Sequence, residues 1–246
     1  MPVDLRSLLA GQSLVRGGPT GGLTGRLTGD QPSAGPSVDW PSVDWPSGNW
    51  PTAVLTMELQ RGVMGDLASF PQLAEAAEAA GTVANTARLL GAARRAGLPV
   101  VHCTAEFRAD RVGTVVNTPL HSAVLRRPDH LLAGTPSTEL VPELGPDAGD
   151  VVSARVHGVS PFIGTSLDAT LRNLGVRVLV VTGVSVNLGV LGLCIEAVNL
   201  GYQVAVPTDA VAGVPADYAA AVLGTSIALV ATLTTVDDVI TALGSP

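Results

Sequence analysis

From Thr52 onward, short apolar runs alternate with stretches of helical patterning, and this alternation constrains the fold more than any other feature. Such alternation is typical of β-α-β units, in which parallel strands form one sheet. The runs are rich in Val, Ala and Leu throughout, which predicts that both faces of the sheet are buried. The sequence therefore predicts a three-layer, doubly wound α/β fold with a mostly parallel six-stranded sheet.

The expected strands are residues 53–57, 98–104, 151–154, 176–182, 203–207 and 229–232. The expected helices are residues 71–96, 166–174, 188–200 and 236–243, with Thr235 as a cap of the last one. Residues 105–150 have only weak periodicity, and so long a connection in a compact domain is usually functional. We expect this segment to roof a pocket at the carboxyl ends of the strands, where open α/β sheets bind ligands.

Residues 1–51 differ in composition from the predicted folded domain, 52–246. They are crowded with Gly, Pro, Ser and Thr, repeat Ser-Val-Asp-Trp-Pro at 37–41 and 42–46, and hold all three tryptophans. Such a segment buries too little apolar surface to offset its ordering entropy, which predicts a disordered tail. The alternative interpretation is that the Trp-Pro repeats are a docking motif for a partner.

Composition excludes several function classes. All 14 residues counted as Lys or Arg are arginines, so no lysine amine is present for Schiff-base chemistry. The net charge of −7 leaves no basic surface for a phosphate backbone, so nucleic acid is not an expected partner. The chain shows neither a signal peptide nor the roughly 20 apolar residues that span a bilayer. With only two cysteines, we expect a cytoplasmic protein without a disulfide framework.

Two segments at expected strand ends could carry chemistry. Glu58 directly follows an apolar run, where partial burial would suit it for general acid or base work. The alternative is that Glu58 caps a helix or pairs with Arg61. Residues 182–189 are a strand end, a turn and a helix start, whose N–H groups favour an anion or a developing oxyanion. Close packing alone would also explain that turn.

The thiols and imidazoles are weaker candidates. Cys194 lies inside an expected helix and is assigned to packing, and Cys103 is most simply a buried strand thiol. The four histidines lack the spacing of metal ligands, so no metal or other cofactor is expected. Among them, we place His157 near the pocket, although a solvent-facing loop position fits equally well.

Several spaced motifs share one order with a known family. Residues 53–60 are similar to an apolar strand ending in Asp-x-Gln, and 156–167 to a Lys-x-x-x-Ser-x-Phe-x-Gly-Thr-x-Leu loop. Residues 182–189 are similar to a Thr-Gly-Val-x-x-x-x-Cys helix start, and Gly-Tyr and Asp-Ala pairs follow at 201–202 and 209–210. Together they resemble the isochorismatase-like (cysteine hydrolase) superfamily of nicotinamidases, carbamoylsarcosine-type amidases and isochorismatases, over about residues 52–243.

The resemblance implies a site whose catalytic triad is altered. The family's Asp, Lys and Cys positions hold Glu58, Val156 and Gly189. The resemblance also implies self-association and a cis peptide between Val184 and Ser185. Expected substrate contacts lie at these motifs and strand ends, namely Gln60, Phe107, Arg155, His157, Phe162, Val184 and Ser185.

Without a cysteine at position 189, the covalent thioester route is unavailable there. In the isochorismatase branch, a glycine likewise replaces the cysteine, and the acid protonates a vinyl ether so that water can complete hydrolysis. Glu58 with Gly189, which leaves space beside the acid, resembles that arrangement. Arg155 carries a positive charge next to Val156, but neighbours on an extended segment point in opposite directions. Whether Glu58 can work alone is therefore the central question.

Two hypotheses follow. In the first, the chain hydrolyses a C–O bond, as in a vinyl ether, or a C–N bond of a small molecule, with Glu58 as general acid or base. In the second, it is a catalytically inactive relative that binds a ligand or forms oligomers. The retained carboxylate favours the first hypothesis, and the altered triad favours the second.

Overall fold

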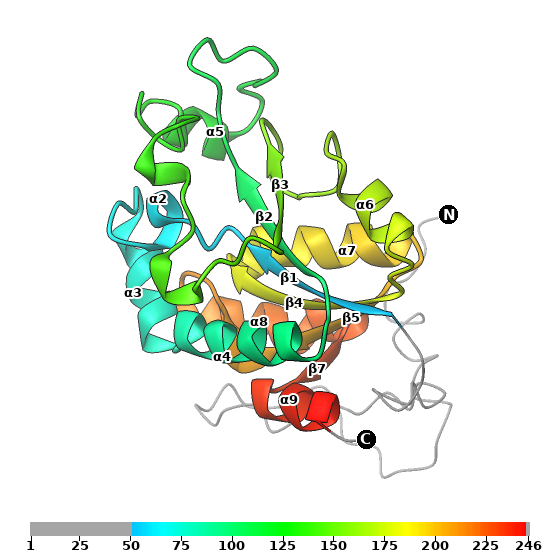
Figure 1. Cartoon of the computed structure of the whole chain (residues 1–246). Coiled ribbons are helices and arrows are strands. Elements are labelled where there is room, and N and C mark those ends of the chain that lie inside the picture. Colours follow the sequence, from blue (N-terminus) through cyan, green and yellow to red (C-terminus); the bar gives the residue numbers. More distant parts are fainter. Residues whose placement is uncertain (1–50, 245–246) are drawn as a thin grey trace, which may run out of the picture. The chain divides into compact units, whose positions relative to one another are not determined.

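A computed structural model describes residues 51–244 of the chain, and the predicted tail lies outside these residues apart from Pro51. One sheet forms the centre, with every strand pairing parallel, in the order β3-β2-β1-β4-β5-β7 and with β6 beside β4 (Figure 1). The strands are β1 Thr52–Met57, β2 Val100–Ala105, β3 Val151–Arg155, β4 Val178–Val184, β5 Gln203–Pro207, β6 Val211–Ala212 and β7 Thr232–Thr234. The predicted doubly wound α/β fold is confirmed, with β6 as a seventh, two-residue strand.

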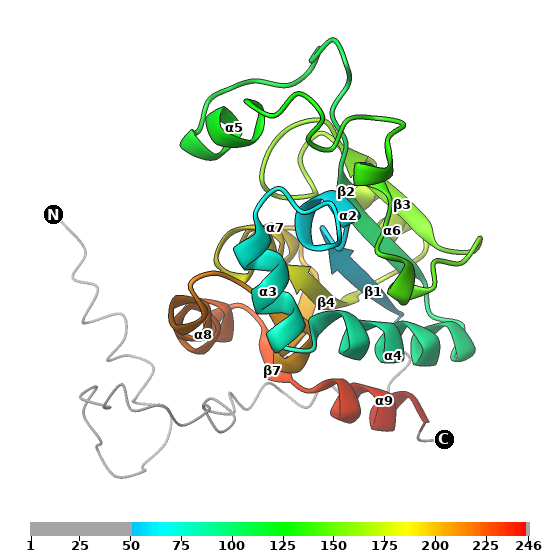
Figure 2. The same cartoon turned by 90° about the vertical axis from the view of Figure 1, so that its left-hand side faces the viewer.

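Helices cover both faces of the sheet (Figure 2). They are α2 Arg61–Met64, α3 Pro71–Ala79, α4 Thr82–Arg95, α5 Pro119–Val124, α6 Leu167–Asn173, α7 Leu191–Asn199, α8 Ala216–Thr225 and α9 Val236–Gly244. Buried side chains of α3, α4 and α9 share one core, and those of α6, α7 and α8 share the other. Within residues 51–244, no helix combines the length and apolar character needed to cross a bilayer.

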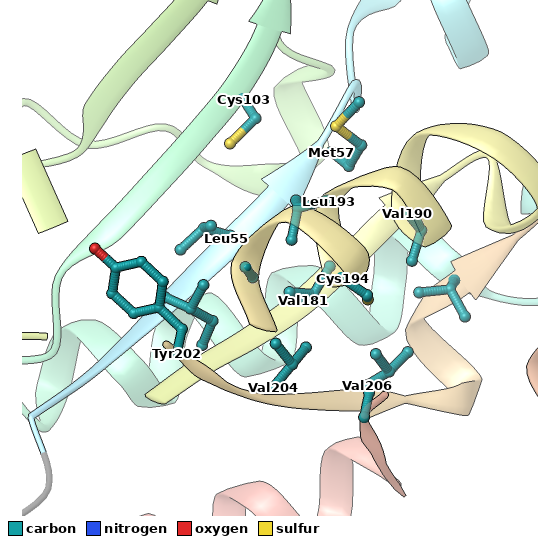
Figure 3. Close-up of a cluster of buried hydrophobic side chains, with 14 of the residues drawn as sticks. Leu55, Met57, Cys103, Val181, Val190, Leu193, Cys194, Tyr202, Val204 and Val206 are labelled. Carbon is teal, nitrogen blue, oxygen red and sulfur yellow. The ribbon is translucent and has the colours of Figure 1, made fainter. Parts of the chain in front are cut away.

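The central strand β1 supplies side chains to both cores. Leu55 and Met57 face the α6–α8 side, where Figure 3 shows them near Leu193 and Cys194 of α7. Val54 faces the opposite side, toward α4. Because successive side chains of a strand point to opposite faces, a strand buried on both sides is apolar at most positions, and in β1 the buried Thr56 hydroxyl is hydrogen-bonded to His102. This explains the continuous apolar run that predicted β1.

Several predicted boundaries were wrong for local reasons. The expected helix 71–96 is two helices, α3 and α4, because the chain turns at Gly81 with a φ of 65°. The expected helix 188–200 begins with one π-helical turn, Val186–Val190, before α7. The expected strand 229–232 is displaced to β7, since Ile227–Leu229 forms a 3-10 turn. The short elements α2, α5 and β6 and the Ala-rich helix α8 were not predicted.

A buried polar network ties the loop before β3 to the sheet. The side chain of Asp150 is only 5% exposed and pairs with Arg94 of α4 at 2.6 Å. It also lies 3.1 Å from Nε2 of His102, whose Nδ1 is 2.8 Å from the Thr56 hydroxyl. Burial opposes ionisation of Asp150, but hydrogen bonds from Arg94, the Asp147 N–H and His102 outweigh it and lower the pKa of Asp150. Thr56 and His102 of this chain are fully buried, and none of its three residues lines the pocket described below.

We predict that Asp150→Ala lowers the free energy of unfolding by about 3 kcal/mol, because it leaves a partly buried guanidinium without its partner. Urea denaturation at pH 7 measures this. The matched control is Asp237→Ala, whose pair with Arg88 is largely exposed and should change stability much less. Since the folded pKa of Asp150 is depressed, its contribution is present above the unfolded pKa and is lost as pH falls through the folded value. Equal losses in the two variants would contradict this prediction.

Candidate functional site

The pocket lies where the winding of the sheet reverses. Strand order runs outward from β1 through β2 to β3 on one side and from β4 through β5 on the other, so the crevice opens at the carboxyl ends of β1 and β4. A pocket of about 340 Å³ is located there. Its lining includes Glu58 after β1, Arg155 at the end of β3, and Ser185 and Gly189 after β4. Glu58, Arg155 and the turn that holds Ser185 and Gly189 are distant in sequence, and these predicted site residues all line the one pocket.

Glu58 is placed by an unusual backbone conformation. It follows β1 directly, has a φ of 51°, and its N–H donates to the carbonyl of Cys103 at 2.9 Å. Positive φ is uncommon for a residue with a side chain, and here it turns the chain sharply at the strand end. The carboxylate lines the pocket and is 19% exposed.

Arg155 supplies the positive charge of the site. Its Nη2 pairs with Oε1 of Glu58. Its Nε donates to the carbonyl of Gly158 at 3.1 Å and its Nη1 to that of Thr104 at 3.4 Å. The side chain is only 5% exposed, so these acceptors compensate for much of its lost hydration. Glu58 therefore does not stand alone, because Arg155, which was expected to contact the substrate, pairs with the acid.

Val156, the position of the family lysine, lies outside the pocket lining. It is 39% exposed, and its carbonyl accepts from the Thr114 hydroxyl at 2.7 Å. Adjacent side chains along an extended strand point in opposite directions, and at the end of β3 it is Arg155, and not Val156, that faces the pocket. His157 likewise does not line the pocket. Its ring centroid lies 4.9 Å from that of His121, which is a lining residue.

Gly189 lies in the first turn after β4, which begins with the expected cis peptide between Val184 and Ser185. Asn187 and Leu188 of the same turn also line the pocket. A β-carbon at position 189 would lie 2.9 Å from Cε of Met57 and 3.2 Å from the carbonyl oxygen of Val184. The expectation that Gly189 leaves open space was therefore wrong, because the end of the Met57 side chain occupies the space that a β-carbon at position 189 would need.

Three expected substrate contacts are packed behind the site. Gln60 is fully buried; its Oε1 accepts from the Ala105 N–H at 2.8 Å, and its Nε2 donates to carbonyls of the roof. Phe162 packs in the core against Tyr202, with ring centroids 6.0 Å apart. Val184 is completely buried. None of the three is a pocket-lining residue, so we regard them as positioning groups.

The segment 105–150 roofs the pocket as predicted. It contributes the lining residues Ala105, Phe107, Leu120, His121, Val124, His130 and Leu131. Phe107 was expected at the pocket, whereas His121 and His130 were not. Burial lowers the pKa of His121, and the nearby charges of His157 and Arg155 act in the same direction. The sequence could have indicated both histidines as pocket residues, because both lie in the long connection 105–150.

No thiol is placed for nucleophilic attack. Cys103 and Cys194 are both fully buried, and burial raises the pKa of each to about 12. A thiolate is the reactive form of cysteine, so neither is activated. Within residues 51–244, no group of three or more His, Cys, Asp or Glu side chains could hold a metal ion. Operation without a cofactor stays a prediction.

Comparisons with known proteins agree on a family. The model of the Isochorismatase domain matches residues 52–238. Ureidoacrylate amidohydrolase RutB of Rhizobium rhizogenes is 33% identical over 167 residues, which are 61% of this chain and 66% of that protein. The matched part of the chain thus spans slightly less than two thirds of that relative's length.

Solved structures show the same fold. An isochorismatase family protein from Desulfovibrio vulgaris has a TM-score of 0.67 and 30% identity, covering 78% of this chain and 100% of that chain. N-carbamoylsarcosine amidase from Thermoplasma acidophilum has a TM-score of 0.60 and 26% identity, covering 76% and 96%.

We predict that a disulfide reagent such as DTNB labels neither cysteine of the native protein within minutes, because both thiols are buried and protonated. In urea, two thiols per chain should react, which controls for prior oxidation. Rapid native labelling of Cys103 would show an activated thiol and reopen a covalent mechanism.

Proposed function

Because this chain belongs to the isochorismatase family, we propose that it hydrolyses a small molecule with Glu58, and not a cysteine, as the acid–base group. One observation carries the proposal. Glu58 lines the pocket, its Oε1 is held by Arg155, and its Oε2 has no hydrogen-bond partner within residues 51–244. A carboxylate fixed by one oxygen and free at the other can exchange a proton with a bound water or substrate.

The geometry supports hydrolysis without a covalent intermediate. Arginine stays protonated at any physiological pH, so Arg155 orients Glu58 and does not itself transfer protons. For a C–N bond, Oε2 takes a proton from water as the water oxygen adds to the carbonyl carbon, and returns it to nitrogen as the C–N bond breaks. The turn 185–189 faces the same pocket and offers backbone N–H groups for the developing oxyanion. For a vinyl ether, a protonated Glu58 instead donates its proton to the terminal alkene carbon. Water then adds to the oxygen-bearing carbon and returns a proton to Glu58, and the resulting hemiacetal or hemiketal breaks its C–O bond to release the alcohol.

The pocket indicates the size and character of the substrate. A volume of about 340 Å³ is at the lower end of small-molecule sites. Most lining side chains are apolar, and Glu58 is the one acid among the described lining residues. The proposal includes a cytoplasmic location, which rests on the low cysteine count, and self-association, which rests on the family resemblance.

A second candidate is a catalytically inactive, ligand-binding relative. The observation in its favour is the packing at Gly189, where Met57 occupies the direction that a cysteine side chain would need. The same pocket would then bind a small molecule without converting it.

We predict that Glu58→Gln lowers kcat/KM at least about a hundredfold, because the amide cannot exchange the proton. The assay follows product formation from ureidoacrylate-type amides, lactams and vinyl ethers. The control Glu75→Gln makes the same change on an exposed turn of α3 and should retain activity. Cys103→Ala should also retain activity.

Two outcomes would overturn the proposal. If the wild-type protein converts none of these substrates, the ligand-binding alternative replaces it; if Glu58→Gln is as active as wild type, the role of Glu58 fails. Val156→Lys tests which position carries the site's cation. Because Val156 lies outside the pocket lining, this lysine should not raise activity.

A further inference from the structure

The turn after β4 places at the pocket one side-chain amide that the chemistry described above does not use. Asn187 lies in the π-helical turn Val186–Val190 and lines the pocket together with Glu58. The other residues of this turn are valine, leucine and glycine, so Asn187 supplies its only polar side chain.

The two ends of the Asn187 amide lie in different surroundings. Oδ1 is enclosed and has no hydrogen-bond partner among the described residues. A β-carbon at Gly213 would lie 2.8 Å from this oxygen, so the oxygen end packs against the chain just after β6. Nδ2 is not enclosed, and no described residue accepts a hydrogen bond from it. Because Asn187 lines the pocket, its nitrogen end faces the pocket.

This orientation of the amide is the more favourable one. Turning the amide over would enclose two N–H donors without an acceptor in place of one oxygen, and buried donors without partners are the rarer case in proteins. An enclosed oxygen without a partner still lowers stability. A need for the nitrogen end at the pocket explains why the fold keeps this cost.

The turn that carries Asn187 stands beside the acid. Strands β1 and β4 are neighbours, with Met57 opposite Gly183. The Met57 side chain reaches the turn itself, where its Cε lies 2.9 Å from the position of a β-carbon at Gly189. Glu58 directly follows Met57, so adjoining walls of one pocket carry the proton acceptor and the amide donor.

Several other polar side chains at the pocket already have partners. Arg155 pairs with Glu58, and Nδ1 of His130 lies 2.7 Å from the hydroxyl oxygen of Ser69. Ser185 also lines the pocket, and its hydroxyl has no hydrogen-bond partner in the part of the chain that the structure describes. This hydroxyl is therefore the rival donor.

We propose that Nδ2 of Asn187 donates a hydrogen bond to the carbonyl oxygen of the substrate, an inference that rests on the hydrolysis proposed at Glu58. As the water oxygen adds to the carbonyl carbon, Glu58 takes the water proton and the π electrons of the C=O bond move to oxygen. Nδ2 stabilises this oxyanion until the C=O bond forms again and the proton passes from Glu58 to the departing nitrogen. Because Oδ1 packs against Gly213, the donor is held in place before the reaction begins.

The donor also distinguishes between the two reactions considered for Glu58. Protonation of a vinyl ether leaves positive charge on the oxygen-bearing carbon, and an N–H group directed at the oxygen does not stabilise that cation. Asn187 therefore favours carboxamides and related compounds with a carbonyl C–N bond as substrates.

Two ligands that differ in one acceptor atom test this inference without requiring turnover. Benzamide and thiobenzamide, whose sulfur is the weaker acceptor, are titrated against the full chain by ligand-observed NMR. Asn187→Leu should lower the ratio of the thiobenzamide Kd to the benzamide Kd about fivefold, as for the loss of one neutral hydrogen bond. Asn187→Asp keeps the shape of the side chain but replaces the donor with an acceptor, and should lower the ratio at least as much. Comparison between variants cancels the larger size of sulfur.

The matched control is Asn199→Asp, which makes the same change at the exposed last residue of α7 and should leave the ratio unchanged. The inference is overturned if wild type binds neither ligand, if the ratio is unchanged in both Asn187 variants, or if Ser185→Ala alone lowers it. A lowered ratio in a protein that hydrolyses none of the substrates above would overturn only the proposed hydrolysis. Where hydrolysis is measurable, Asn187→Leu should lower kcat about a hundredfold, more than it raises KM. Glu58-dependent hydrolysis with an unchanged ratio would overturn only the role of Asn187.

Discussion

The ion pair between Glu58 and Arg155 is the interaction on which the site depends. It exists because β3 lies two strands from β1, a separation of about 10 Å that a long guanidinium side chain can cross. On its way Arg155 reaches the carbonyl of Thr104 at the end of β2, so one side chain links three consecutive strands. The order of the sheet is therefore a condition for the chemistry as well as for the fold.

The fold could be predicted because burial on both faces makes parallel strands apolar at most positions, as in β1 and β4. Short elements such as β6 and α2 carry too few residues to show a period. Helices α3 and α4 were predicted as the single helix 71–96, because a glycine such as Gly81 can lie within a helix or end it. The π-helical turn Val186–Val190 that precedes α7 was not predicted, because such a turn has no distinct sequence pattern.

Of the predicted site residues, Glu58, Arg155, Ser185 and Gly189 line the pocket, and the position of Val156 outside it arises from single-residue register. Counting back from the Ser-x-Phe motif selects Val156 as the lysine position, yet β3 buries Ser153 and Arg155 and exposes Val152. The buried alternation along β3 is the physical signal for Arg155. Gln60 was predicted to contact substrate because the sequence does not show that its side-chain amide is hydrogen-bonded to backbone groups of Ala105 and Thr138. His130 could not be linked to Ser69, 61 positions away, without the folded chain.

The clamp formed by Gln60 limits how the pocket can exchange its contents. This amide fastens the roof at Ala105 and again at Thr138, and Asp150 anchors its far end to α4. A swing of the whole roof as a hinged lid would break buried or partly buried hydrogen bonds at all three places. We therefore expect exchange of the pocket's contents to need only rearrangement of residues 106–131 between the fastened points, a smaller motion than closure of a complete lid.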